Sequence, residues 1–214
     1  MKVIAFVPIK FKSQRLKNKM LLPLGDYVLC QHIFFTLLKV KQKVNIDIYC
    51  FCSDEEIKKY LPDGIMFLKR DKCLDCNETK GIDIYNSFCK KIKGDIYGLF
   101  HATSPFINES SIIEGFNKVI YNDYDSSFSC SQIKTFCWYN NTTLNYELTN
   151  VVRTQDITPI YWETSAFYIF KSNVIENNRR IGENPFMVIT NKYESVDIDE
   201  QDDYDLARAL LNKP

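Results

Sequence analysis

Hydrophobic and polar residues alternate along this chain in a way that predicts repeated β-strand and α-helix units. Residues 3–8 form a short, continuous apolar run, which is typical of a strand buried on both faces. Apolar residues then recur at helical spacing over 28–40, and 46–52 has the pattern of a strand again. The later units are strands at 64–68, 95–101 and 126–131, with helices around 82–92 and 112–120 between them. This alternation predicts an α/β fold with a mostly parallel sheet between layers of helices.

The second half of the chain departs from this regular pattern. Residues 134–159 have no regular period and are rich in aromatic side chains, which predicts an excursion from the sheet, either a dimer arm or a lid over a substrate. Residues 165–171 read as a strand, and 193–197 as a further strand leading into a last helix. Ser53 is predicted to cap a helix that follows the strand 46–52. We expect residues 1–214 to form one domain, with 134–160 as the dimerisation or lid segment within it.

Composition narrows the class of protein. A chain of 214 residues that is 45% hydrophobic should bury roughly 70% of its unfolded surface without disulfides or metal staples. Its 27 basic and 27 acidic residues cancel, which argues against a general nucleic-acid binder. The first apolar run is too short to span a membrane and no cleavage site follows, so we expect a soluble, cytoplasmic protein without a membrane partner.

Eight cysteines and only two histidines favour buried free thiols over a zinc site. Cys50 and Cys52 should lie on one face of a strand, because alternate strand residues point the same way. Cys73 and Cys76 remain the candidates for a metal or redox pair.

Cations are concentrated in the loop after the first strand, at Lys10, Lys12, Arg15, Lys17 and Lys19. Arginine forks and mobile lysine charges at the carboxyl end of a strand can converge on a triphosphate. The alternative is a solvated basic loop. The segment 9–24 contains no glycine, so it is neither a P-loop nor a dinucleotide fingerprint, and a phosphate grip here would depend on side chains.

Asp197 and Asp199 are the candidate metal ligands. If 193–197 is a strand, the two carboxylates lie on one side of it and offer the hard oxygens that Mg²⁺ prefers. The alternative for Asp199 is a cap for the helix that begins near Glu200. Asp197 is also a possible base for an acceptor hydroxyl, and two further loops, 101–105 and 153–156, offer His101 and Arg153 as polar candidates.

The order of these motifs resembles the acylneuraminate (CMP-sialic acid synthetase) cytidylyltransferase family, over nearly the whole chain. The residues that carry the resemblance are Pro8, Lys10, Ser13, Arg15 and Lys19, then Ser53, Asp54 and Glu56, then Thr103, Ser104 and Pro105, then Arg153, Gln155 and Tyr161, and finally Asp197, Ile198 and Asp199.

The resemblance implies a Rossmann-like nucleotidyltransferase (GT-A-like) three-layer sandwich that acts as a homodimer. It implies a Mg²⁺-dependent transfer of CMP from CTP to an acidic sugar, giving a CMP-sugar for surface glycan biosynthesis and pyrophosphate. By position, the triphosphate would be held by Lys10, Ser13, Arg15 and Lys19, and the residues near the nucleoside would be Asn18 and Arg70. The Mg²⁺ ligands would be Asp197 and Asp199. The acceptor would be faced by His101, Thr103, Arg153, Gln155 and Tyr161. Arg15, Lys19, Asp197 and Asp199 would be the catalytic set.

Departures from the family pattern leave the acceptor open. The first loop reads Lys10-Phe11-Lys12-Ser13-Gln14 where family members usually carry an Arg-x-Gly-Ser-Lys opening, and its Ser-Arg-Leu order is closer to Kdo cytidylyltransferases. His101, Ile107 and Thr164 replace residues usual at acceptor-facing positions. The alternatives are therefore a non-sugar acid or phosphorylated small molecule as acceptor, a non-catalytic nucleotide-binding homologue, and a glycosyltransferase of similar topology.

Overall fold

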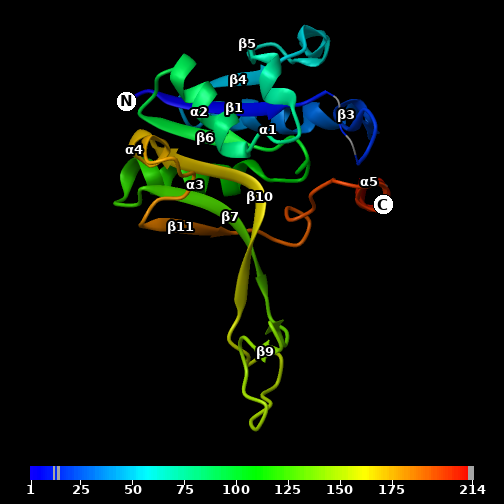
Figure 1. Cartoon of the computed structure of the whole chain (residues 1–214), viewed down its shortest axis with the longest axis vertical. Coiled ribbons are helices and arrows are strands. Elements are labelled where there is room, and N and C mark those ends of the chain that lie inside the picture. The colour runs from blue at the N-terminus through cyan, green and yellow to red at the C-terminus, as the bar shows by residue number, and fades with distance from the viewer. Residues whose placement is uncertain (12, 14, 212–214) are drawn as a thin grey trace.

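A seven-stranded sheet lies at the centre of the computed structural model, which describes residues 1–11, 13 and 15–211 (Figure 1). Its strand order is β11-β7-β10-β6-β1-β4-β5, and only β10 runs antiparallel to its neighbours among these strands. Lys12 and Gln14 of the basic loop lie outside the described residues. The sheet strands are β1 (Val3–Ile9), β4 (Ile46–Cys52), β5 (Met66–Lys69), β6 (Ile96–Phe100), β7 (Ser126–Ile133), β10 (Ile160–Lys171) and β11 (Pro185–Ile189). The predicted mostly parallel α/β sheet is confirmed.

Helices cover both faces of the sheet, because the central strands bury both sets of alternating side chains. On one face, Val3, Ala5 and Val7 pack with helices α1 (Leu29–Lys41) and α3 (Glu109–Tyr121). On the other face, Phe6 packs with α2 (Gly81–Lys91) and α4 (Ser172–Glu176), and its ring stacks on Phe88 at a centroid distance of 4.2 Å. Cys50 and Cys52 share the first face, as the strand period predicts. The result is the predicted three-layer arrangement.

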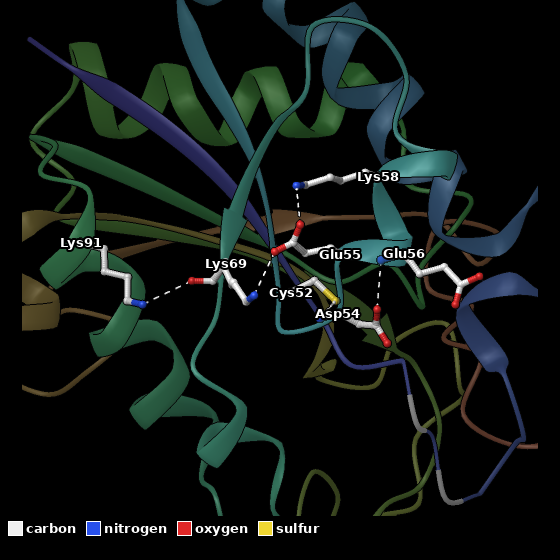
Figure 2. Close-up of polar contacts among 7 residues, drawn as sticks. All are labelled: Cys52, Asp54, Glu55, Glu56, Lys58, Lys69 and Lys91. Carbon is white, nitrogen blue, oxygen red and sulfur yellow. Dashed lines mark hydrogen bonds and ion pairs between the residues drawn. The ribbon is translucent and has the colours of Figure 1, made fainter.

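The segment after β4 differs from its prediction. It is a 3₁₀ helix, η2 (Glu55–Tyr60), and its cap is Asp54, whose carboxylate accepts from the Glu56 backbone N–H at 3.0 Å (Figure 2). The prediction that Ser53 caps this helix is wrong, because its hydroxyl donates instead to Asp75 in the 3₁₀ helix η3 (Lys72–Asp75).

The predicted strand at 193–197 is also wrong. Strand β11 ends at Ile189, and a turn follows over 192–195. The buried Glu194 accepts hydrogen bonds from the Asn108 N–H and the Ser111 hydroxyl at the start of α3. These hydrogen bonds hold residues 192–195 at the start of α3 and away from the sheet, so Asp197 and Asp199 lie on a loop.

Residues 134–159 form an arm that projects from one end of β7 and β10 (Figure 1). It contains the short strands β8 (Trp138–Tyr139) and β9 (Thr142–Thr143). Trp138, Tyr139, Leu148 and Val151 are exposed on it. β10 begins at Ile160, five residues earlier than the predicted strand, because β7 and β10 pair as a ribbon at the base of the arm.

The segment that follows β1 packs against the C-terminal segment of the chain. Leu16, Leu24 and Leu29 share a buried cluster with Ile198 and Tyr204, the latter in α5 (Gln201–Leu211). This region also contains a short 3₁₀ helix, η1 (Lys19–Leu21), and a hairpin of two short strands, β2 (Pro23–Leu24) and β3 (Tyr27–Val28). Over residues 1–11, 13 and 15–211, no helix combines the length and apolar character needed to cross a membrane.

Candidate active site

Two cations of the first loop converge on Asp199. The Lys19 ammonium and the Arg15 guanidinium lie 2.8 Å from its two carboxylate oxygens, one on each. Lys19 is only 7% exposed at its side chain, whereas Arg15 is 58% exposed. Burial favours the neutral acid, but the Lys19 hydrogen bond and both positive charges outweigh it and hold the pKa of Asp199 below its usual range. The basic loop is therefore not merely solvated.

Asp199 does not cap α5. The Asp199 and Glu200 backbone N–H groups donate to Asp203 Oδ2 at 3.0 and 2.9 Å, so Asp203 has the capping role. The Asp199 carboxylate is left to face Lys19 and Arg15. The capping alternative for Asp199 is thus wrong, because both of its carboxylate oxygens are engaged by the two cations rather than by N–H groups of the helix.

The third loop joins the same edge. The backbone N–H of Ile198 donates to the Thr103 carbonyl at 2.8 Å, which fixes the Asp197–Asp199 loop against the end of β6. His101 follows the last residue of β6, and the charges of Asp197 and Asp199 act on it. Burial lowers the pKa of His101, although Asp197 and a hydrogen bond to the Ser165 backbone oppose the shift. The structure therefore brings His101 and Thr103 beside the acidic pair.

The two aspartates fit a Mg²⁺ ion. Asp197 Oδ1 is buried and has no hydrogen-bond partner among the described residues. An unpaired carboxylate oxygen in this position is costly unless a cation or ligand satisfies it. No group of three or more His, Cys, Asp or Glu side chains within the described part of the chain could hold a metal, but Mg²⁺ commonly takes one or two carboxylates and completes its shell with water and phosphate.

A cavity of about 480 Å³ opens beside the basic loop, at the ends of β1, β4 and β5. Its lining comprises Lys10, Phe11, Ser53, Asp54, Glu55, Lys69, Lys72 and Asp75. Figure 2 shows Glu55 held between Lys58 and Lys69, each 2.9 Å away, and these hydrogen bonds lower its pKa to about 2. The cavity wall is thus a fixed set of charged side chains.

Arg70 lies behind this wall. It is 2% exposed, forms a 2.6 Å ion pair with Asp75 and lies over the Phe51 ring. Lys10 reaches Asn77 at 3.5 Å, Ser13 is half-buried, and Asn18 has left-handed backbone (φ 54°) immediately before η1. Arg70 therefore supports a cavity residue, and Lys10 lines the cavity directly.

Three predicted acceptor residues lie elsewhere. Arg153 forms an exposed 2.6 Å ion pair with Asp156 within the arm, and Gln155 is exposed there too. The Tyr161 hydroxyl, at the start of β10, accepts a hydrogen bond from Gln132. Since the arm projects from the sheet (Figure 1), one chain does not bring Arg153 and Gln155 to its own His101.

The anchor Glu194 and the cluster of Tyr85, Glu163 and Arg180 beside His101 are absent from the sequence prediction. No local motif marks them. Only Glu194 itself could have suggested a cap for the helix at 109, and this would require knowing that the two segments meet.

A family model for cytidylyltransferases matches residues 4–213. The chain belongs to the cytidylyltransferase family. It is accordingly an enzyme of the nucleotidyltransferase class that uses CTP, and the acidic pair facing a basic loop is its candidate catalytic edge. No curated protein matches the chain.

Solved structures share the fold of this cytidylyltransferase at low identity. A CMP:2-keto-3-deoxy-manno-octonic acid synthetase complexed with CTP aligns with a TM-score of 0.69 and 14% identity, covering 99% of this chain and 98% of that one. A 4-diphosphocytidyl-2C-methyl-D-erythritol synthase from Anaerococcus prevotii aligns with 0.70 and 12%, covering 99% and 96%. The bifunctional IspDF from Campylobacter jejuni aligns with 0.68 and 10%, covering 96% of this chain and 54% of that one.

Proposed function

We propose that this cytidylyltransferase transfers CMP from CTP to an acidic sugar, an ulosonic acid of the sialic-acid or Kdo type, for surface glycan biosynthesis. The observation that carries the proposal is the pairing of Asp199 with both Arg15 and Lys19 next to His101. It combines phosphate-binding cations, metal-binding carboxylates and an acceptor-facing edge in one place.

The reaction would be an in-line displacement. An acceptor hydroxyl oxygen attacks the α-phosphorus of CTP, the bond to the β-phosphate bridging oxygen breaks, and pyrophosphate leaves while the hydroxyl proton passes to solvent or a nearby base. Lys10, Ser13, Arg15 and Lys19 would hold the triphosphate and neutralise the leaving group. Catalysis would then rest on positioning and electrostatics.

Asp197 and Asp199 would hold Mg²⁺. The ion supplies Lewis-acid stabilisation of phosphate charge. For Asp199 to reach it, the ion pairs with Arg15 and Lys19 must loosen, and triphosphate oxygens are suitable replacement partners for both cations.

A homodimer is part of the proposal. The arm at 134–159 exposes Trp138, Tyr139, Leu148 and Val151, and apolar side chains clustered on a projecting segment favour burial against a partner. A second copy would also give Arg153, Gln155 and Tyr161 a route to an acceptor site that their own chain does not provide.

A phosphorylated small molecule is the second candidate acceptor. The Kdo-type synthetase and the methylerythritol-type synthase are equally similar in structure to this chain, so the fold does not distinguish between a carboxylate and a phosphate acceptor.

The test is pyrophosphate release from CTP and Mg²⁺ with N-acetylneuraminate, Kdo and 2-C-methyl-D-erythritol 4-phosphate, for the wild type and for Arg15→Ala. We expect one ulosonate to be turned over and Arg15→Ala to be at least tenfold slower. Turnover of the phosphate acceptor alone would transfer the assignment to the second candidate, and no release with any of the three would reject the proposed acceptor class.

A further inference from the structure

We propose that Arg180 is the anion receptor of the acceptor site, and that the acceptor is a hydroxylated acid whose carboxylate or phosphate binds this guanidinium. The inference rests on the proposed function and names the residue that would select the acceptor. Arg180 is outside every motif that marks the nucleotide site.

Arg180 belongs to a connected polar cluster that reaches the catalytic edge. Its Nη2 donates to Glu163 at 3.0 Å, and its guanidinium lies over the Tyr168 ring, whose centroid is 6.2 Å from that of the His101 ring. The Tyr85 hydroxyl lies 3.5 Å from His101 Nε2, and the charge of Asp197 acts on His101. The cluster therefore links Arg180 to the side of the acidic pair where an attacking hydroxyl would approach.

Packing fixes the guanidinium plane. The Arg180 guanidinium carbon lies 4.0 Å from the centroid of the buried Tyr168 ring, and the Tyr168 hydroxyl donates to Glu163 at 2.7 Å. Side-chain geometry held by stacking and paired hydrogen bonds is preorganised for a ligand. A surface arginine without such partners would lose this advantage to side-chain entropy.

The backbone around the cluster is also fixed. β10 has an irregular register between Glu163 and Tyr168, and Ser165 within it has a φ of +60°, which is rare for a residue other than glycine. Strained residues at bulges concentrate near functional sites. On the other side, Asp125 accepts from the Glu183 and Asn184 N–H groups and anchors the loop that carries Arg180.

Arg180 retains access and spare donors. Its side chain is 37% exposed, and Glu163 is 42% exposed. A guanidinium has five N–H donors, so the bond to Glu163 leaves donors for an anion. Glu163 can accept from hydroxyls beside that anion, which is why a hydroxylated acid fits the pair better than a simple anion.

Two other cations are the competing receptors. Lys134 and Lys192 line a cavity of about 710 Å³ that also contains Asp197 and Asp199. Both lysines are exposed, and the described residues do not give either a fixed ion-pair partner. Arg153, the carboxylate partner predicted from sequence, pairs with Asp156 in the arm.

The first experiment uses steady-state kinetics of pyrophosphate release with the three acceptors named above. Arg180→Ala should raise the acceptor KM about 10- to 100-fold and leave the KM for CTP within twofold. Arg180→Lys should recover part of the loss, since it keeps the charge but not the fork. Arg179→Ala is the matched control, because the neighbouring Arg179 pairs with Glu183 and not with the cluster.

The second experiment needs no turnover. NMR of ¹⁵N-labelled arginine side chains follows the Arg180 Nε–H signal, assigned by its absence in Arg180→Lys, during titration with gluconate and with inorganic phosphate. We expect a saturable shift of this signal, stronger with one anion, which distinguishes a carboxylate from a phosphate acceptor.

Three results would overturn the inference even if the wild-type enzyme releases pyrophosphate. They are an unchanged acceptor KM in folded Arg180→Ala, a larger increase in acceptor KM in Lys192→Ala, and an Arg180 NMR signal that does not shift with either anion. Loss of release with every acceptor, together with a shifting Arg180 signal, would reject the proposed function and leave the anion site.

Discussion

The Nζ of Lys19 donates to Oδ1 of Asp199 at 2.8 Å, although 180 positions separate the two residues in the chain. Lys19 is buried, and this carboxylate also pairs with Arg15. A basic loop at one end of the sequence and an acidic stretch at the other thus form one site. The chain as a whole has a net charge of zero, but at this site a positively charged loop lies against a negatively charged stretch.

Removing the buried lysine tests its part in catalysis. Lys19→Ala should lower kcat/KM for CTP about 100- to 1,000-fold, because one fixed positive charge at the leaving group contributes about 3–4 kcal/mol to transition-state stabilisation. Lys17→Ala is the matched control, since Lys17 lies in the same loop but is exposed. Equal losses in the two variants would show that only the total charge of the loop matters.

Asp197→Asn separates function from stability. We expect at least a hundredfold lower activity and weaker Mn²⁺ binding by electron paramagnetic resonance, because the buried Oδ1, which has no hydrogen-bond partner among the described residues, is the proposed metal ligand. The melting temperature should stay the same or rise, since an unpaired buried carboxylate oxygen is destabilising. Asp202→Asn, on the exposed side of α5, should leave both measurements unchanged; retained Mn²⁺ binding in Asp197→Asn would argue against the metal assignment.

The arm can be tested by size-exclusion chromatography with light scattering. Leu148→Asp combined with Val151→Asp should convert the proposed homodimer to a monomer, because two charges would be placed in the surface that we expect to be buried. Tyr121→Asp, equally exposed but on α3, should leave the dimer intact. A wild-type chain that elutes as a monomer at micromolar concentration would rule out this assembly.

Asp125 should make stability depend on pH. Burial favours its neutral form, but hydrogen bonds from the Asn184 N–H, the Ser126 hydroxyl and the Glu183 N–H outweigh it and lower its pKa. Its stabilising effect is therefore complete above its unfolded pKa of about 3.9 and is lost as the pH falls through the lower folded value.

Urea unfolding at several pH values measures this effect. Asp125→Asn should reduce the free energy of unfolding by about 1–2 kcal/mol at pH 7, with the difference from wild type shrinking below pH 4. Asp123→Asn, exposed in the same turn, should show no such trend. A difference that stays constant down to pH 2 would contradict the ionic origin of the stabilisation.

Thiol reactivity should divide the eight cysteines. Burial raises the pKa of Cys30 and of Cys89 to about 12, whereas Cys73 and Cys76 are exposed. Ellman's reagent on the native protein at pH 8 should modify Cys73 and Cys76 within minutes and the half-buried Cys137 more slowly. The remaining five should react only after denaturation, and rapid reaction of all eight would show that the core opens readily.

Periodicity predicted most of the fold because each element carries its own pattern. Strand Ile46–Cys52 has the predicted bounds, and the helical spacing over 28–40 places α1 within one residue at either end. The apolar residues that form the buried face of such an element all lie within its own segment, so the local sequence is enough to identify the element. The basic loop was placed correctly by the strand before it, whereas the acidic pair was placed on a strand, 193–197, that the structure does not contain.

The errors fall where a distant contact decides the local structure. Ser53 donates to Asp75 rather than capping a helix, and the turn at Glu194 is fixed by the start of α3. Neither partner is near in sequence, so local propensity was overruled by tertiary hydrogen bonds.

By itself, the sequence determined the α/β alternation, the irregular arm and the residue types of a CTP-using site. Only the tertiary structure decided which of those residues meet: Asp199 lies against Lys19, Arg153 stays on the arm, and Arg180 packs on Tyr168 beside His101. The reason is that hydrophobic period records which face of an element is buried, whereas the pairing of charges depends on the order of strands in the sheet and on the loops that link them.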